Sequence, residues 1–88
     1  MMDQEEHRRM RWAARRGMLE LDLVLEPFVD ACYPQLSEEQ RLVFQRLMEC
    51  EDQELFAWLL QRGQPEDSEL AGLVSQILDF ARRPPADR

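Results

Sequence analysis

Apolar residues recur at intervals of three and four along most of this 88-residue chain, and this spacing constrains the fold more than any other feature. The pattern is clearest between residues 67 and 83. The apolar stripe there consists of Leu70, Leu73, Val74, Ile77, Leu78 and Ala81. Such spacing places side chains on one face of an α-helix, which must pack against another element. We therefore predict an all-α protein.

Residues 19–25 compete with this prediction, because they alternate apolar and polar side chains as a half-buried strand does. We predict a helix here. Leu, Met and Glu favour helices, no second strand is available for pairing, and apolar residues continue at helical spacing. They are Met18, Leu21, Leu25, Phe28 and Cys32. We expect Pro27 to kink this helix or to begin a second short one, since its ring does not fit an unbroken helix interior.

Capping and stopping residues predict where the first helix begins and ends. Asp3 with Glu6 resembles a capping box, and the helix is expected to run to about Arg16. Gly17 should stop it, because glycine best adopts the left-handed conformation that ends many helices. The pair Arg16-Gly17 thus predicts a sharp turn between two helices.

Three further helices follow from the same reasoning. Ser37 with Gln40 predicts a capping box after a connection at residues 33–36, and Asp52 is expected to cap the fourth helix. Their predicted core residues are Val43, Phe44, Leu47 and Met48 in the third helix, and Leu55, Phe56, Leu59 and Leu60 in the fourth. Gly63 and Pro65 should close the fourth helix, and Pro84-Pro85 the fifth.

The expected architecture is a compact bundle of five short helices in a single domain spanning residues 1–88, frayed at about 1–2 and 84–88. A chain of this size buries only about 60–65% of its unfolded surface, so its core should be thin. Cys32 and Cys50 lack metal-ligand spacing and are expected to be buried as small apolar residues.

Charge and hydropathy argue against two classes of partner. The net charge is −7, and only residues 8–16 are basic, with five arginines and no acid. A nucleic-acid binder would usually be basic over its whole domain. No apolar run approaches the roughly 20 residues that span a bilayer, and the acidic start lacks a signal segment. We therefore expect a cytoplasmic protein without membrane insertion.

Catalysis by this chain is not expected. The single histidine, His7, is predicted to be solvated on a frayed first turn. The sequence also lacks a Gly-rich phosphate loop and a Ser-His-Asp or Cys-His arrangement. Paired carboxylates would need a desolvated cleft, which thin bundles seldom have.

The basic first helix is more informative. Helical spacing brings Arg8, Arg9, Arg15 and Arg16 within reach of Trp12, and an indole among arginines is typical of an interface centre. The alternative is that Trp12 packs inward while the arginines are solvated.

The turn that follows places Arg16 and Glu20 on either side of a tight junction, next to outward-facing backbone donors. A purely local role is also open, in which these two residues form an exposed ion pair worth about 0–1 kcal/mol.

Two blocks of sequence resemble a known family. Residues 11–22, Arg-Trp-Ala-Ala-Arg-Arg-Gly-Met-Leu-Glu-Leu-Asp, look like the Arg-Gly-x-x-Glu signature of the SdhE-type succinate dehydrogenase assembly factors. Residues 47–59 are similar to the family's second block, in which an Asp precedes a Leu-Phe-x-Trp-Leu run. The resemblance spans about residues 8–80, and two ordered blocks are more specific than either alone.

The resemblance implies a non-enzymatic, five-helix protein that promotes covalent attachment of FAD to the flavoprotein subunit of succinate dehydrogenase or fumarate reductase. The histidine that receives the flavin belongs to that partner, so FAD is not expected to bind tightly to this chain. The implied partner-binding residues are Arg16, Gly17 and Glu20, surrounded by Arg9, Trp12, Arg15, Met18 and Asp22. Trp58, in the second block, is expected to be structural rather than a contact.

Two other functions stay open at this level. Relatives of this family have been labelled antitoxins, and an acidic body could neutralise a basic toxin. A helix-turn-helix DNA binder using the first helix is the other alternative, and it would show steep salt dependence. We expect a monomer or a weak homodimer.

Overall fold

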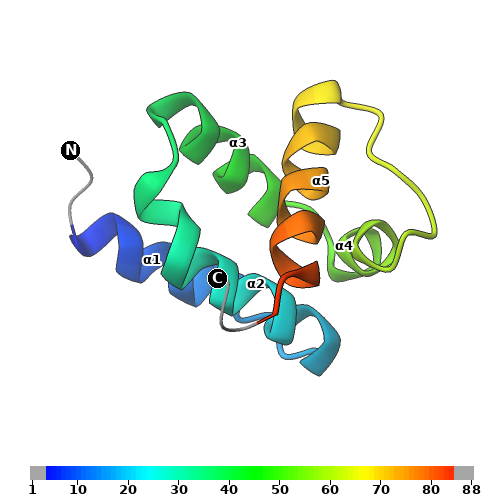
Figure 1. Cartoon of the computed structure of the whole chain (residues 1–88), viewed down its shortest axis with the longest axis horizontal. Helices are drawn as coiled ribbons and strands as arrows, with labels where there is room; N and C mark the ends of the chain where they lie inside the picture. Colours follow the sequence, from blue (N-terminus) through cyan, green and yellow to red (C-terminus); the bar gives the residue numbers. More distant parts are fainter. Residues whose placement is uncertain (1–3, 85–88) are drawn as a thin grey trace.

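A computed structural model describes residues 4–84, which form five α-helices and one short 3₁₀ helix (Figure 1). The elements are α1 (Gln4–Ala14), α2 (Leu19–Cys32), η1 (Tyr33–Gln35), α3 (Glu38–Met48), α4 (Asp52–Leu59) and α5 (Ser68–Arg82). The described part contains no strand, so the predicted all-α class and the helix over residues 19–25 are confirmed. The expected capping box at Asp3 and most of the predicted frayed ends lie outside the described residues.

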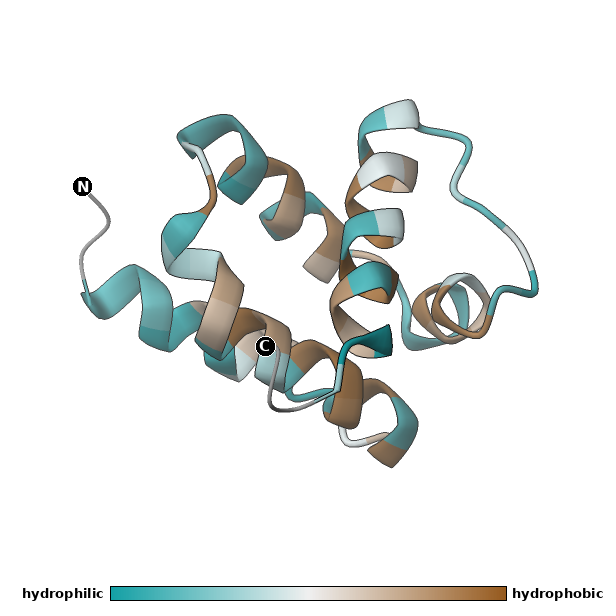
Figure 2. Ribbon diagram, viewed as in Figure 1, coloured by the Kyte–Doolittle hydropathy of each residue, from teal (hydrophilic) through white to brown (hydrophobic). Residues whose placement is uncertain are grey.

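Helix α2 lies at the centre of the packing, in contact with α1, α4 and α5, while α3 packs on α5. Figure 2 shows the reason: α1 and the connection from α4 to α5 are mostly hydrophilic, whereas α2 is rich in apolar residues. Phe28 of α2 is fully buried, with its ring 5.9 Å from Phe44 of α3 and 5.7 Å from Phe80 of α5. Three helices therefore meet at one aromatic centre.

Two predictions about α1 and α2 are corrected. Helix α1 ends at Ala14, two residues early, because the Arg16 N–H donates to Asp22 Oδ1 at 2.8 Å instead of continuing the helix. Helix α2 runs through Pro27, so the alternative that a second helix begins there is wrong, whereas the kink stays a prediction. Pro27 has no N–H to donate to the carbonyl of Leu23, four residues earlier. Leu23 is 64% exposed, so water can bind this carbonyl instead.

The capping box of Ser37 and Gln40 is confirmed, but α4 differs from its prediction at both ends. Its N-cap is Glu51, whose N–H donates to Glu54 Oε1 at 3.2 Å, and Asp52 is the first helical residue. At the other end, Gln61 rather than Gly63 has a positive φ, 61°. Leu60, expected in the core, is 42% exposed.

Most other core predictions are confirmed, with a few differences of degree. Val43, Phe56, Leu70 and Leu78 are partly buried and pack against the core. Phe80 is buried at 4% exposure, although it was left out of the predicted stripe of α5. Cys32 and Cys50 are half-buried, and burial raises the pKa of both thiols.

Candidate partner-binding site

A corner of four residues, 15–18, joins α1 to α2. Gly17 has φ +84°, the left-handed conformation predicted for it, and a Cβ at this position would meet nothing within 4 Å. Met18 is the extended N-cap of α2, and its carbonyl accepts hydrogen bonds from the N–H groups of Leu21 (3.0 Å) and Asp22 (2.9 Å). Gly17 and Glu20 are exposed. The corner therefore presents an open stretch of backbone with a carboxylate beside it.

Arg16 does not share this exposure. Its Nε donates to Asp52 Oδ1 at 2.7 Å, and its terminal nitrogens donate to the carbonyls of Ala13 (3.0 Å), Met48 (2.9 Å) and Cys50 (2.9 Å). Only 17% of its side chain is exposed. The structure thus pairs Arg16 with Asp52, not with Glu20 as the local alternative supposed.

Trp12 lies on the surface, 69% exposed, so the inward-packing alternative is wrong. Of the arginines expected around its ring, Arg15 has its guanidinium carbon 5.6 Å from the ring centroid, a cation–π distance. Arg9 is exposed on α1, and Arg16 turns away into the body of the protein.

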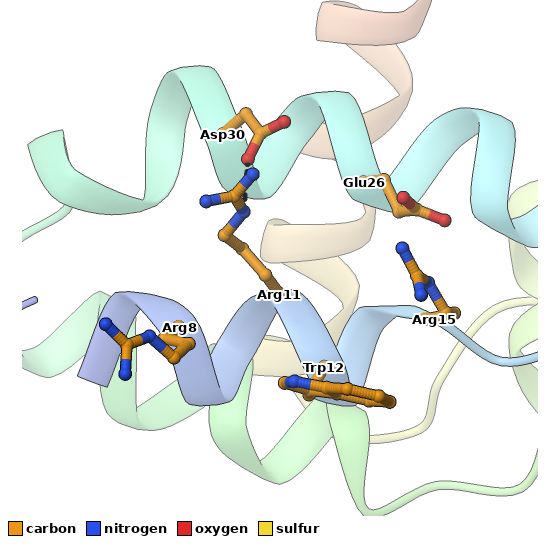
Figure 3. Close-up of a pocket in the computed structure, with 6 residues that line it drawn as sticks. All are labelled: Arg8, Arg11, Trp12, Arg15, Glu26 and Asp30. Carbon is orange, nitrogen blue, oxygen red and sulfur yellow. Dashed lines mark ion pairs between the residues drawn. The ribbon is translucent and has the colours of Figure 1, made fainter. Parts of the chain in front are cut away.

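A shallow groove runs between α1 and α2 beside this ring (Figure 3). Its lining consists of Arg8, Arg11, Trp12, Arg15, Glu26 and Asp30. Arg11 Nε is 2.9 Å from Asp30 Oδ1, and Figure 3 shows Arg15 extending toward Glu26. The groove therefore carries arginines along one wall and carboxylates along the other.

Two exposed leucines extend the same face of α2. Leu19 and Leu23 are 68% and 64% exposed, and helical spacing aligns them with Glu26 and Asp30. Sequence reasoning missed these leucines as surface residues. The signal was present, because both lie off the apolar stripe that contains Leu21.

The predictions for His7 and Trp58, which lie outside the corner and the groove, have different outcomes. His7 is not simply solvated: its Nε2 lies 3.0 Å from the Val29 carbonyl, and its ring stacks on Tyr33 with centroids 6.4 Å apart. It therefore links α1 to α2. Trp58 is half-buried against the core, which agrees with a structural role.

Within residues 4–84, no group of three or more His, Cys, Asp or Glu side chains has an arrangement that could hold a metal ion. Helices long and apolar enough to cross a membrane are likewise not found among these residues.

Comparison with known proteins shows which family the chain is similar to. A family model described as "Flavinator of succinate dehydrogenase" matches residues 8–81. A protein of Pseudomonas aeruginosa named FAD assembly factor SdhE is 52% identical over 79 residues, covering 90% of this chain and 94% of that protein. One of the same name from Idiomarina loihiensis is 54% identical over 74 residues, covering 84% and 82%.

A similar fold has been solved. The solution structure of UPF0350 protein matches with a TM-score of 0.76 and 41% identity, covering 91% of this chain and 85% of that one. The names of the curated relatives favour the assembly-factor expectation over the antitoxin alternative.

Proposed function

This chain belongs to the family of flavinators of succinate dehydrogenase, and we propose that it binds the flavoprotein subunit of that enzyme and promotes its covalent flavinylation. Its relatives are named FAD assembly factors, which supports this role. The resemblance to the family also implies fumarate reductase, whose flavoprotein subunit we propose as a second client.

The observation that carries a docking role is the position of the exposed apolar side chains. Trp12, Leu19 and Leu23 are each at least 64% exposed, and all three lie on α1 and α2 near the corner. Large apolar groups gathered beside charged groups mark protein interfaces, where tryptophan and arginine carry much of the binding energy. The proposed docking face comprises the corner, the groove, the two leucines and the exposed Arg9 and Glu20.

The charged residues of the docking face suggest what the partner offers. Arg9 and Arg15 are exposed and suit carboxylates or carbonyls, while Glu20 suits a basic or amide group. Gly17 lets the partner approach the backbone closely, because no side chain intervenes. Trp12, Met18 and Asp22 complete the proposed contact set around Gly17 and Glu20.

The proposed mechanism needs no catalytic group from this chain. Covalent flavinylation requires the flavin and its acceptor residue to be held in a reactive geometry within the flavoprotein. A protein that binds only that conformation raises its population without taking part in the chemistry. The chain then acts in the cytoplasm as an assembly factor and not as an enzyme, and FAD stays bound to the partner.

The test is in-gel flavin fluorescence of a co-expressed flavoprotein subunit. Gly17→Arg should abolish covalent flavin, because a bulky cation would block the approach of the partner at the corner. Gly63→Arg controls for the added cation, since Gly63 is exposed and has no atom within 4 Å of an added Cβ. Gly17→Ala controls for strain in the left-handed backbone at φ +84° and should keep covalent flavin. Circular dichroism should show that all three variants remain helical.

Normal flavinylation by a folded Gly17→Arg protein would remove the corner from the mechanism. If the wild-type chain neither bound the flavoprotein subunit nor increased its covalent flavin, the proposed function itself would be refuted. Capture of a toxin in place of a flavoprotein would favour the antitoxin alternative.

A further inference from the structure

Arg16 physically joins the two sequence blocks that identify the family. Arg16 belongs to the corner, and Asp52 begins α4, 36 residues later. Their side chains meet at 2.7 Å between Nε and Oδ1. The Arg-Gly-x-x-Glu block and the Asp that precedes Leu-Phe-x-Trp-Leu are therefore two halves of one contact.

The same guanidinium also binds the ends of two helices. It donates to Ala13, in the last turn of α1, and to Met48, the last residue of α3. Carbonyls in the last turn of a helix have no partner within the helix and carry partial negative charge. A third bond goes to Cys50, in the short connection to α4. One side chain thus fastens α1, α3 and α4 together behind the corner.

These bonds leave little of Arg16 for a partner. A guanidinium has five N–H donors, and four of them are used within the protein. Direct recognition of a flavoprotein by this side chain would first have to break charge-assisted bonds, which are the strong ones. Its backbone N–H is also engaged, by Asp22 Oδ1 at 2.8 Å. Arg16 is anchored on both sides, whereas the neighbouring Gly17 and Glu20 are exposed.

We propose that Arg16 and Asp52 are positioning residues, which hold the corner in the shape that the flavoprotein recognises and do not contact the flavoprotein themselves. This inference rests on the proposed function. It assigns recognition to Gly17, Glu20 and the rest of the docking face, and it gives Asp52 a role in binding although it lies on another helix.

The two possible roles of Arg16 make opposite predictions for Asp52. If Arg16 positions the corner, Asp52→Ala removes its anchor and weakens binding. If Arg16 contacts the flavoprotein, Asp52→Ala releases the guanidinium, and binding is unchanged or tighter. The measurement is the Kd for the purified flavoprotein subunit by isothermal titration calorimetry, at a temperature where circular dichroism shows every variant folded.

Three variants accompany Asp52→Ala. Asp52→Asn keeps an acceptor oxygen and should fold where Asp52→Ala is too unstable. Arg16→Lys keeps the charge but not the planar fork that reaches three carbonyls, so it should weaken binding as Asp52→Ala does. Glu54→Ala is the matched control, because it removes a hydrogen bond at the start of α4 without touching Arg16.

We expect Asp52→Ala and Arg16→Lys each to raise the Kd by about tenfold to a hundredfold. Asp52→Asn should have a smaller effect in the same direction, and Glu54→Ala should leave the Kd unchanged. Amide hydrogen exchange should be faster at Arg16 and Asp22, whose N–H groups are hydrogen-bonded at the corner, in the Asp52 variants of the free protein. Exchange in the middle of α5 should stay at the wild-type rate. A general loss of stability would not produce this local pattern.

An unchanged or lower Kd for folded Asp52→Ala would overturn the inference, and so would unchanged exchange at the corner. Neither result would affect the proposed function, which fails only if the wild-type protein does not bind or flavinylate the flavoprotein subunit.

Discussion

The hydroxyl of Tyr33 donates a 2.7 Å hydrogen bond to Glu6 Oε2, across 27 residues of sequence. Arg41 Nε donates to the same carboxylate oxygen at 2.9 Å, and Gln45 Nε2 donates to the Tyr33 hydroxyl at 3.1 Å. This polar network ties α1 to η1 and α3. It therefore fastens the end of α1 that lies away from the corner, much as Arg16 fastens the near end.

Tyr33→Phe tests the contribution of this network to stability. The ring would stay buried, but the hydroxyl would be lost and Gln45 would lose its acceptor. We expect the free energy of unfolding to fall by about 1–2 kcal/mol, the usual effect of removing one partner from a buried hydrogen bond. Urea denaturation followed by circular dichroism measures it. An unchanged midpoint would mean that solvent replaces the network at no cost.

Alkaline pH should act through the same hydroxyl. Burial, together with the Glu6 carboxylate, raises the pKa of Tyr33 to about 12 from 10.0, against the opposing effect of the hydrogen bond from Gln45. Because the folded pKa is the higher one, this stabilisation is complete below about pH 10 and is lost as the pH rises through about 12, a change of about 2–3 kcal/mol.

Tyr33 is the only tyrosine, so near-ultraviolet absorbance of tyrosinate reports on this group alone. The chain has no lysine, so no lysine titrates in the same pH range. Comparing wild type with Tyr33→Phe across the alkaline range isolates its contribution from those of the two thiols. If both proteins lost stability equally between about pH 10 and 12, the loss would have another source.

A pair of leucines separates binding from folding. Leu23 is 64% exposed on the docking face, whereas Leu73 is 4% exposed in the core. Leu23→Ala should leave the free energy of unfolding within about 0.5 kcal/mol of wild type but weaken flavoprotein binding by more than about 1 kcal/mol. Leu73→Ala should reduce the free energy of unfolding by about 2–5 kcal/mol through a cavity. Equal stability losses would show that the docking face is misplaced.

Helical periodicity predicted most of the fold because apolar spacing and caps act locally. The Ser37 capping box needs only residues three apart, and the left-handed turn needs only Gly17. The orientation of Trp12 was not predictable in this way. Which face of a helix is buried depends on what covers it, and α2 covers the opposite side of α1, where Ala14 is fully buried.

The direction of the Arg16 side chain could not be predicted from the sequence for a related reason. Helical spacing indicates where a side chain points only while the helix continues, and α1 ends two residues before Arg16. Its partner Asp52 is distant in sequence, so no local pattern connects the two. The same contact explains why Asp52 is not the N-cap of α4: its carboxylate binds Arg16, and Glu51 caps instead.

A glycine introduced at the end of α4 should raise the free energy of unfolding, whereas loss of the glycine at the corner should lower it. Gln61 has φ 61°, and the N–H groups of Gln61 and Arg62 donate to the carbonyls of Trp58 (3.1 Å) and Ala57 (2.7 Å), the pattern of a Schellman motif. A side chain is strained in this conformation, so Gln61→Gly should raise the free energy of unfolding by about 0.5–1 kcal/mol.

At Gly17 the same argument runs in reverse. A Cβ there meets nothing within 4 Å, so the effect of Gly17→Ala comes from the backbone at φ +84° alone. We expect it to lower the free energy of unfolding by about 1 kcal/mol, and Gly17→Asn by less, because asparagine tolerates the left-handed region. Urea denaturation of the three variants measures both effects. Changes of the same sign at positions 17 and 61 would show that φ does not control the stability of these two turns.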